Sequence, residues 1–172
     1  MAVQAEGRIV VTEHQDFKLY NIYFPNGGSG KERHDFKQKF LEDLAEHLRP
    51  LVAKGEKIIV TGDYNIAHQP IDIHDPVKLA GESGFLPEER AWFDRFLEMG
   101  FVDTFRLKHP TVKDKYTWWS YLERGRQIGN RGWRIDYFCV TKNLVSRVQR
   151  AEIMDQTMGS DHCPVLLELA DA

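Results

Sequence analysis

The stretch Lys57–Asn65 reads KIIVTGDYN and joins an apolar run directly to a polar turn. The β-branched residues at 58–61 are typical of a buried strand, and Gly62 predicts where that strand ends. Asp63 and Asn65 are two residues apart, so their side chains project from the same side of an extended chain. The stretch therefore predicts a core strand that carries a carboxylate and a carboxamide at its end.

Around this strand, the periodicity of apolar residues predicts further strands and two amphipathic helices. Phe36, Phe40, Leu44 and Leu48 recur every four residues, the period of a helix face. Because strands outnumber helices without regular alternation, we expect an α/β (α+β-like) fold of packed sheets rather than a doubly wound sheet. The predicted elements are strands at 8–12 and 17–24 (an antiparallel pair), 57–61, 116–121, 133–140, 146–153 and 164–169, helices from 31 to about 50–55 and from 87 to 99, and a surface loop at 68–84.

The composition is that of a globular protein. The chain has 172 residues, is 42% hydrophobic and carries a net charge of −3, so any nucleic-acid binding needs a local patch. No apolar run reaches the roughly 18 residues of a membrane span, and residues 1–8 lack the apolar stretch of a signal peptide. Cys139 and Cys163 form neither a CxxC pair nor a disulfide framework, so we expect a reducing, cytoplasmic setting.

Polar side chains recur where the predicted strands end. Tyr23 lies at the end of 17–24, Asp136 interrupts 133–140, and Asp161 and His162 precede the last strand. Each has a structural explanation by itself, since Gly-Asp-x-Asn is a common turn and a single His or Tyr usually packs in a core. Asp136 is the exception, because a carboxylate in a buried strand needs a cation or a strong donor. Together these residues predict one shared polar site.

Two other segments resemble ligand sites only superficially. The run Gly27–Lys31 resembles a phosphate-binding loop, but Glu32 stands where Ser or Thr would hold magnesium. Asp72, His74 and Asp75 could suggest a metal site, yet nothing in a loop fixes their geometry. We interpret them as solvated turn residues.

The segment from Trp118 to Asp136 is basic and aromatic, with only Glu123 and Asp136 as acidic residues. Arginines bind phosphates, and exposed tryptophans stack on bases or line sugar pockets. An equally good interpretation places the tryptophans in the core and the arginines in a solvated loop. The residues concerned are Trp118, Trp119, Arg124, Arg126, Arg131, Trp133 and Arg134.

Four ordered motifs carry a family resemblance: YFPN at 23–26, GDYN at 62–65, GWRIDY at 132–137 and SDHCP at 160–164. They resemble the exonuclease III-type apurinic/apyrimidinic (AP) endonucleases of the endonuclease/exonuclease/phosphatase superfamily. Residues 84–90 (GFLPEER) and 100–106 (GFVDTFR) are similar to bacterial members. The similarity extends from residue 6 to residue 169.

The resemblance implies a phosphodiesterase that uses Mg²⁺ or Mn²⁺. Such enzymes cut double-stranded DNA on the 5′ side of abasic sites and remove nucleotides or blocking groups from 3′ ends. Asp63 would position or deprotonate the attacking water, and Asn65 would orient it. Asp136 would orient His162, which stabilises charge on the phosphate oxygens, and Tyr23 would contact the phosphate or the leaving group. The implied metal ligands are Asp63, Asn65, Asp161 and His162.

The same resemblance implies a pocket for a flipped-out sugar that lacks a base. A normal nucleotide is excluded by its size and by the cost of extrusion. The implied pocket and DNA contacts are Asn26, Arg90, Trp118, Arg131, Trp133 and Ile135. The implied setting is a bacterial cytoplasm, with nucleoid association during action on DNA.

The chain departs from the family at its beginning. Members open with a strand bearing a Trp-Asn-x-Asn-Gly-like motif and a second strand ending in Gln-Glu, whose Glu is a principal metal ligand. Neither motif occurs here. We therefore expect residues 1–172 to form one N-terminally truncated domain, the C-terminal portion of a four-layer α/β sandwich with mixed and antiparallel sheets. Its metal affinity and turnover would be impaired. An exposed apolar sheet face would need a missing N-terminal segment or a second chain to cover it.

Two other functions compete with DNA cleavage. A catalytically silent DNA-binding module would use the Arg/Trp segment without cutting. A phosphoinositide or sphingomyelin hydrolase would keep the chemistry and change the substrate, but Trp118, Trp133 and the bacterial-type segment 85–90 argue against it.

Overall fold

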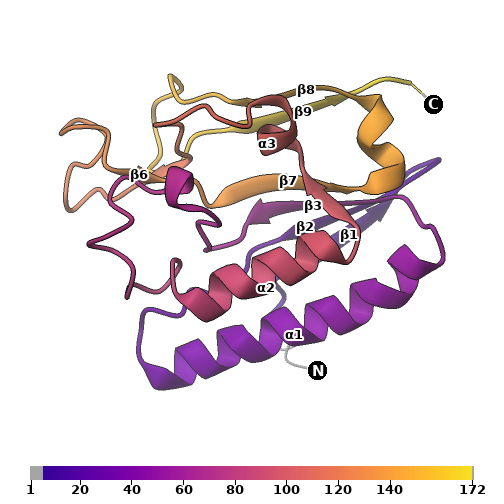
Figure 1. Ribbon diagram of the computed structural model, residues 1–172, viewed down its shortest axis with the longest axis horizontal. Coiled ribbons are helices and arrows are strands. Elements are labelled where there is room, and N and C mark those ends of the chain that lie inside the picture. The colour runs from indigo at the N-terminus through magenta and orange to yellow at the C-terminus, as the bar shows by residue number, and fades with distance from the viewer. Residues whose placement is uncertain (1–5, 172) are drawn as a thin grey trace.

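The computed structural model describes residues 6–171 and has two long helices on one face of a mixed five-stranded sheet (Figure 1). A two-stranded ladder lies on the other side of that sheet. The elements are β1 Ile9–Glu13, β2 Lys18–Ile22, α1 Lys31–Ala53, β3 Ile58–Asp63, a 3₁₀ turn at Pro70–Asp72, α2 Pro87–Glu98, β4 Phe101–Asp103, α3 Thr104–Lys108, β5 Trp118–Trp119, β6 Gly132–Trp133, β7 Asp136–Thr141, a 3₁₀ turn at Lys142–Arg147, β8 Val148–Ile153 and β9 Val165–Leu169.

The large sheet has the strand order β1-β2-β3-β7-β4. Strands β1 and β2 form the predicted antiparallel pair, β2 and β3 run parallel, and β7 runs antiparallel to both β3 and β4. The register of β3 against β7 places Asp63 directly opposite Asp136. This mixed sheet with its separate ladder confirms the predicted α/β class and differs from a doubly wound fold.

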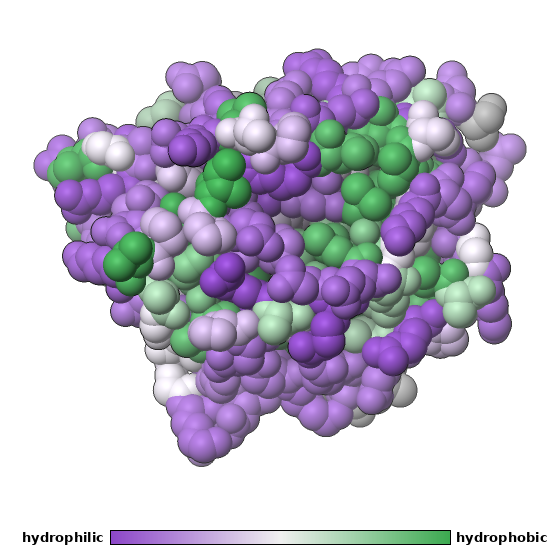
Figure 2. Space-filling view, in the orientation of Figure 1, coloured by the Kyte–Doolittle hydropathy of each residue, from purple (hydrophilic) through white to green (hydrophobic). Residues whose placement is uncertain are grey.

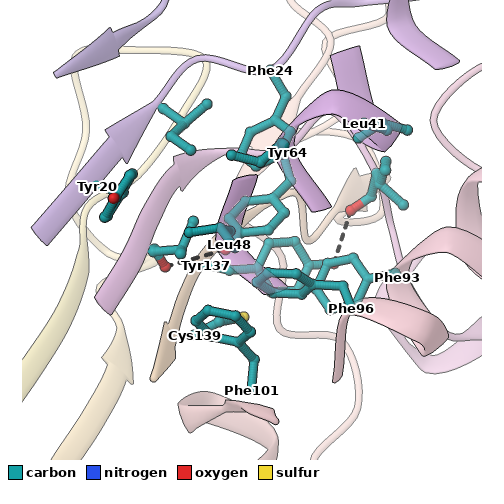
Figure 3. Packing of buried hydrophobic residues seen from close by; sticks show 14 of the residues in the cluster. Tyr20, Phe24, Leu41, Leu48, Tyr64, Phe93, Phe96, Phe101, Tyr137 and Cys139 are labelled. Carbon is teal, nitrogen blue, oxygen red and sulfur yellow. Dashed lines mark hydrogen bonds between the residues drawn. The ribbon is translucent and has the colours of Figure 1, made fainter. Parts of the chain in front are cut away.

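Helices α1 and α2 are held to the sheet by an aromatic core (Figure 3). Phe40, Leu44 and Leu48 of α1 are fully buried, as their four-residue period predicts. Trp92 of α2 donates its indole N–H to the carbonyl oxygen of Leu41 at 2.9 Å and so joins the two helices. The ring of Tyr64, one residue beyond β3, packs into this core, which fixes the turn that follows the strand.

The opposite face of the sheet carries a smaller apolar cluster under the β8–β9 ladder. Ile59, Val140, Leu144 and Val148 are buried there, whereas Phe17, Leu19, Phe138, Val145, Leu167 and Leu169 are only partly buried. Hydrophobic side chains gather between the ladder and the large sheet on the face shown in Figure 2. Val10 and Val11 of the edge strand β1 are exposed. Apolar side chains on this part of the sheet are thus partly exposed in residues 6–171, and a covering segment or chain stays a prediction.

Two predicted strands differ from those in the structure, and two short elements were not predicted. The strand predicted at 116–121 is only Trp118–Trp119, and the one predicted at 133–140 is split into β6 and β7 by Arg134 and Ile135. The short elements β4 and α3 were not predicted, because three-residue and five-residue segments show no usable period.

A buried ionic cluster explains the split between β6 and β7. The guanidinium of Arg134 donates to both carboxylate oxygens of Asp72, at 2.8 and 3.0 Å, and to Asp103 at 2.7 Å. Arg106 donates to Asp72 at 2.6 Å. Asp72 is 0% exposed, so its interpretation as a solvated turn residue was wrong. Burial raises the pKa of its carboxyl group, but Arg134 and Arg106 outweigh that effect and bring the pKa to about 2.

Replacing Arg134 by leucine should destabilise the protein strongly. Arg134→Leu leaves Asp103 without this partner and Asp72 with Arg106 as the remaining charged partner, and breaking a buried pair costs about 3–5 kcal/mol of unfolding free energy. Urea denaturation measures this loss. The matched control is Arg95→Leu, which removes an exposed pair with Glu42 and should cost no more than about 1 kcal/mol. Equal losses in the two variants would contradict the role assigned to the cluster.

Candidate active site

A cavity of about 750 Å³ lies where β3 ends and β7 begins. It is lined by side chains from the ends of strands and from four loops that are distant in sequence, those after β2, β3, β5 and β8. The predicted site residues on its lining are Tyr23, Asn26, Asp63, Asn65, Trp118, Arg131, Trp133, Ile135, Asp161 and His162. The structure therefore brings together nearly all of the residues that sequence reasoning singled out.

The turn after β3 is held by its own polar side chains. The backbone N–H of Asn65 donates to Asp63 Oδ1 at 2.8 Å, and the Asn65 side-chain amide donates to Asp63 Oδ2 at 3.1 Å. The same amide also donates to the Phe24 carbonyl oxygen at 2.9 Å. Asn65 has a φ of 51°, a left-handed conformation that asparagine tolerates better than most residues. The Gly-Asp-x-Asn sequence thus forms a turn and presents its carboxylate to the cavity.

Two carboxylates face each other across the sheet at this point. Asp63 lies opposite Asp136 in the β3–β7 ladder. Burial raises the pKa of the Asp63 carboxyl group, and the negative charge of Asp136 raises it further, to about 7. A carboxyl group with this pKa can accept a proton near neutral pH, as a general base must.

Asp136 binds the second titratable group of the site. Its Oδ2 atom lies 2.9 Å from His162 Nδ1. Burial by itself would lower the pKa of the imidazole, but the hydrogen bond and charge of Asp136, with smaller effects from Asp63 and Asp161, raise it overall. The strong donor that Asp136 was expected to require is therefore His162, and the Nε2 atom remains for a ligand in the cavity.

The segment that carries Asp161 and His162 is fixed against β5. Backbone N–H groups of Trp119 and Cys163 donate to the carbonyl oxygens of Asp161 and Thr117, at 2.9 and 2.8 Å. The Trp118 indole donates to Asp161 Oδ2 at 3.1 Å. This short strand pairing sets the position of His162 relative to Asp136.

Tyr23 and Asn26 close another side of the cavity. Tyr23 is half-exposed, and the Arg8 guanidinium lies 4.9 Å from the centre of its ring. Asn26 donates through its side-chain amide to Asn65 Oδ1 at 3.0 Å, which connects this segment to the turn after β3.

Apolar rings form the remaining wall. Trp118 and Trp133 meet edge to face, with ring centres 6.3 Å apart, and Ile135 packs in the same cluster with Phe85. Because both tryptophans are only partly buried, their exposed edges are available to a ligand.

The Arg/Trp segment serves two purposes. Trp119 is buried in a separate cluster under the Arg126 guanidinium, as the structural interpretation proposed. Arg134 fits neither interpretation, because it is fully buried in the ionic cluster and not in a solvated loop. Trp118, Arg131 and Trp133 face the cavity, as the functional interpretation proposed.

Arg90 does not line the cavity formed by the described residues. Its Nε atom donates to the His68 carbonyl oxygen at 2.8 Å, and its guanidinium stacks on Phe85. A backbone acceptor and an aromatic ring thus bind its head group outside this cavity lining, and a contact of Arg90 with DNA stays a prediction.

The sequence profile of the Endonuclease/Exonuclease/phosphatase family matches residues 5–162. The chain belongs to this family.

Similar proteins of this family include nucleases and phosphatases. An exodeoxyribonuclease of Bacillus subtilis is 42% identical over 162 residues, which cover 94% of this chain and 64% of that protein. An AP endonuclease from Archaeoglobus fulgidus superposes with a TM-score of 0.87 at 30% identity, covering 96% of this chain and 66% of the other. A 3′ phosphatase from Neisseria bound to a product DNA hairpin has a TM-score of 0.87 at 26% identity and covers 98% and 68%. The chain thus spans less than two thirds of the Bacillus subtilis relative.

A buried residue that sequence reasoning missed supports the site. Thr117 is 0% exposed, and its hydroxyl oxygen accepts the backbone N–H groups of Ile135 and Asp136 at 2.9 and 3.0 Å. It thereby fixes the chain between β6 and β7. A single threonine in a loop shows no period or motif, so only the fold identifies it.

The donor set falls short of a complete metal site within residues 6–171. No group of three or more His, Cys, Asp or Glu side chains in that range is placed to hold one ion. Both Asp63 oxygens accept hydrogen bonds from Asn65, and His162 Nδ1 is occupied by Asp136. The ligand set Asp63, Asn65, Asp161 and His162 stays a prediction, as does the choice of Mg²⁺ or Mn²⁺.

The opposition of Asp63 and Asp136 predicts a pH-dependent signal. The Asp63 carboxyl group should titrate near pH 7, and Asp136→Asn should move that midpoint down toward the ordinary value of 3.8. The pKa of Asp63 is higher in the folded than in the unfolded protein, so between about pH 4 and pH 7 the folded state binds more protons. The free energy of unfolding therefore decreases as the pH rises through this range. Carbon-13 NMR of the carboxyl group measures the midpoint. Asp161→Asn is the control and should leave it near 7; a shift of equal size there would refute the pairwise cause.

Proposed function

We propose that the chain is a phosphodiesterase module that acts on DNA. The observation that carries this proposal is that Asp63 and His162 line one cavity while Asp136 is hydrogen-bonded to the His162 ring, which gives a base of raised pKa and an oriented imidazole. Family membership supports hydrolysis of a phosphate ester as the reaction class. The names of its relatives, an exodeoxyribonuclease and an AP endonuclease, support DNA as the substrate.

The proposed chemistry begins at Asp63. Its carboxylate takes a proton from a water molecule, whose oxygen attacks phosphorus while the bond to the 3′ oxygen breaks, and the released 3′ oxygen takes a proton from solvent. Protonated His162 donates from Nε2 to a non-bridging oxygen and balances the charge that develops there. Asp136 keeps the ring oriented through Nδ1, and Asn65 holds the Asp63 carboxylate. Tyr23, at the rim, would hydrogen-bond the phosphate or assist the leaving oxygen.

The proposed substrate is duplex DNA with an abasic site or a 3′ end. Trp118, Trp133 and Ile135 offer an apolar wall against which a sugar without a base fits, and Arg131 and Asn26 lie beside it for phosphate contacts. A divalent cation remains part of the proposal.

Among the helices of residues 6–171, none has the length and apolar composition of a membrane span. A cytoplasmic setting stays a prediction.

A catalytically silent DNA-binding module is the second candidate. It is favoured by one observation, the incomplete donor set for a metal within the described residues. This candidate predicts binding of abasic duplex that persists in EDTA and is unchanged by Asp63→Ala.

Loss of either catalytic group should abolish most of the cleavage. Asp63→Asn and His162→Ala should each reduce the rate at least about 10²-fold, the scale for removing a fixed transition-state group. The measurement is incision of a duplex with one abasic-site analogue, with Mg²⁺, with Mn²⁺ and with EDTA. Glu123→Gln, at the rim of the cavity, is the control. Near-normal cleavage by both variants refutes the assigned roles. Binding without any cleavage by the unmodified chain favours the silent module.

Trp133 should contribute to selection of the abasic site. Trp133→Ala should weaken the preference for abasic over intact duplex more than it weakens overall binding, because the ring forms the wall that meets the sugar. Fluorescence anisotropy with the two duplexes measures both quantities. Trp92→Phe, in the core, serves as the control for a general loss of aromatic packing. Equal weakening on both duplexes would assign Trp133 to packing alone.

A further inference from the structure

A buried ion pair lies directly behind the turn that carries Asp63 and Asn65. Lys37 of α1 and Glu89 of α2 are both 0% exposed, with Nζ 2.5 Å from Oε1. Lys37 falls on the buried face of α1, one turn before Phe40 and Leu41 of the core. Leucine or methionine would fill that position without desolvating a charge. A buried pair is weak evidence for stability, so its presence requires another explanation.

Lys37 connects the helix to the catalytic turn. Its ammonium group donates a second hydrogen bond, 2.9 Å long, to the backbone carbonyl oxygen of Asn65. The backbone of Asn65 is therefore held on both sides, because its N–H donates to Asp63 Oδ1. The lysine contacts the residue whose left-handed backbone conformation forms the turn.

Glu89 connects the same pair to the backbone at Gly84, which lines the cavity beside Asn65 and Trp133. Its Oε2 atom accepts the backbone N–H groups of Gly84 and Leu86, at 2.6 and 3.1 Å. The Gly84 carbonyl oxygen in turn accepts the N–H of Ala67 at 2.7 Å. Gly84 lies so close to Asn65 and Trp133 that a Cβ atom there would lie 3.1 Å from the Asn65 carbonyl oxygen and 3.1 Å from the Trp133 ring.

We infer that Lys37 and Glu89 are positioning residues that set the distance between the catalytic turn and the Trp133 wall. Lys37 fixes the Asn65 carbonyl, Glu89 fixes the Gly84–Leu86 backbone, and their ion pair joins the two. Misplacement of a reacting group by about 1 Å can cost 10²-fold in rate, so rigid support from two helices has catalytic value. This inference rests on the proposed phosphodiesterase function of the same cavity.

The decisive variant is Lys37→Met/Glu89→Gln. It removes the donor to Asn65 without leaving a buried charge, and the side-chain carbonyl introduced at position 89 can still accept from the loop backbone. Lys37→Arg keeps a cation with several donors and is the rescue variant. Lys31→Met is the matched control, because Lys31 lies on the same helix in an exposed pair with Asp35.

Two measurements separate positioning from general stability. Hydrogen exchange should accelerate at least about tenfold at the amides of Asn65, Ala67 and Gly84 in the double variant, while the Val60 amide in β3 stays unchanged. In DNA incision, kcat should fall at least about tenfold with KM changed less than about twofold. The single variant Lys37→Arg should keep the amide exchange rates and kcat within about threefold of the unmodified chain. Lys31→Met should change neither quantity.

The inference is overturned if exchange accelerates equally at Val60, or if it does not accelerate at Asn65, Ala67 and Gly84. It is also overturned if the unmodified chain cleaves DNA and the double variant has the same kcat. If the unmodified chain does not cleave DNA, the proposed function fails, and the exchange measurement still decides whether the pair positions the turn.

Discussion

The site depends on the register of β3 against β7, which places two carboxylates opposite each other at the end of two inner strands of the sheet. Like charges in directly opposed positions are unfavourable, so the structure must supply donors or raise a pKa. It does both, because His162 binds Asp136 while the Asp63 carboxyl group titrates near neutral pH. A slip of β3 by one residue would turn the Asp63 side chain to the other face of the sheet, away from Asp136. The aromatic core around Tyr64 opposes such a slip.

Buried polar groups behind the cavity maintain this register. Thr117 accepts two backbone N–H groups, Arg134 joins Asp72 to Asp103, and Lys37 reaches the carbonyl of Asn65. Each of these hydrogen bonds joins a loop to a strand or a helix and so limits the movement of the loop. Apolar residues would fill the same volumes at lower desolvation cost, but they could not fix backbone groups at defined distances. The polar interior therefore favours precision of the site over stability.

The chain matches its family over most of its length, but its two apolar clusters are not equally covered. The family profile covers residues 5–162, and the chain spans 64% of an exodeoxyribonuclease relative. The aromatic core between the helices and the sheet is fully formed, whereas the cluster on the opposite side keeps Phe17, Leu19 and Phe138 partly exposed. The open apolar side lies on the sheet face opposite α1 and α2, and the cavity is built at the ends of strands.

Much of the architecture follows from sequence alone. The four-residue period determined α1, the apolar run at 58–61 determined β3, and polar residues at strand ends identified one shared site. Only the tertiary structure decided which of the arginines and which of the tryptophans face the cavity. Arg131 lines it while Arg134 is buried with Asp72, and Trp133 faces it while Trp119 lies in the core. The physical reason is that burial of a charge depends on partners distant in the chain, such as Asp72 for Arg134 and Glu89 for Lys37. Local periodicity contains no information about those partners.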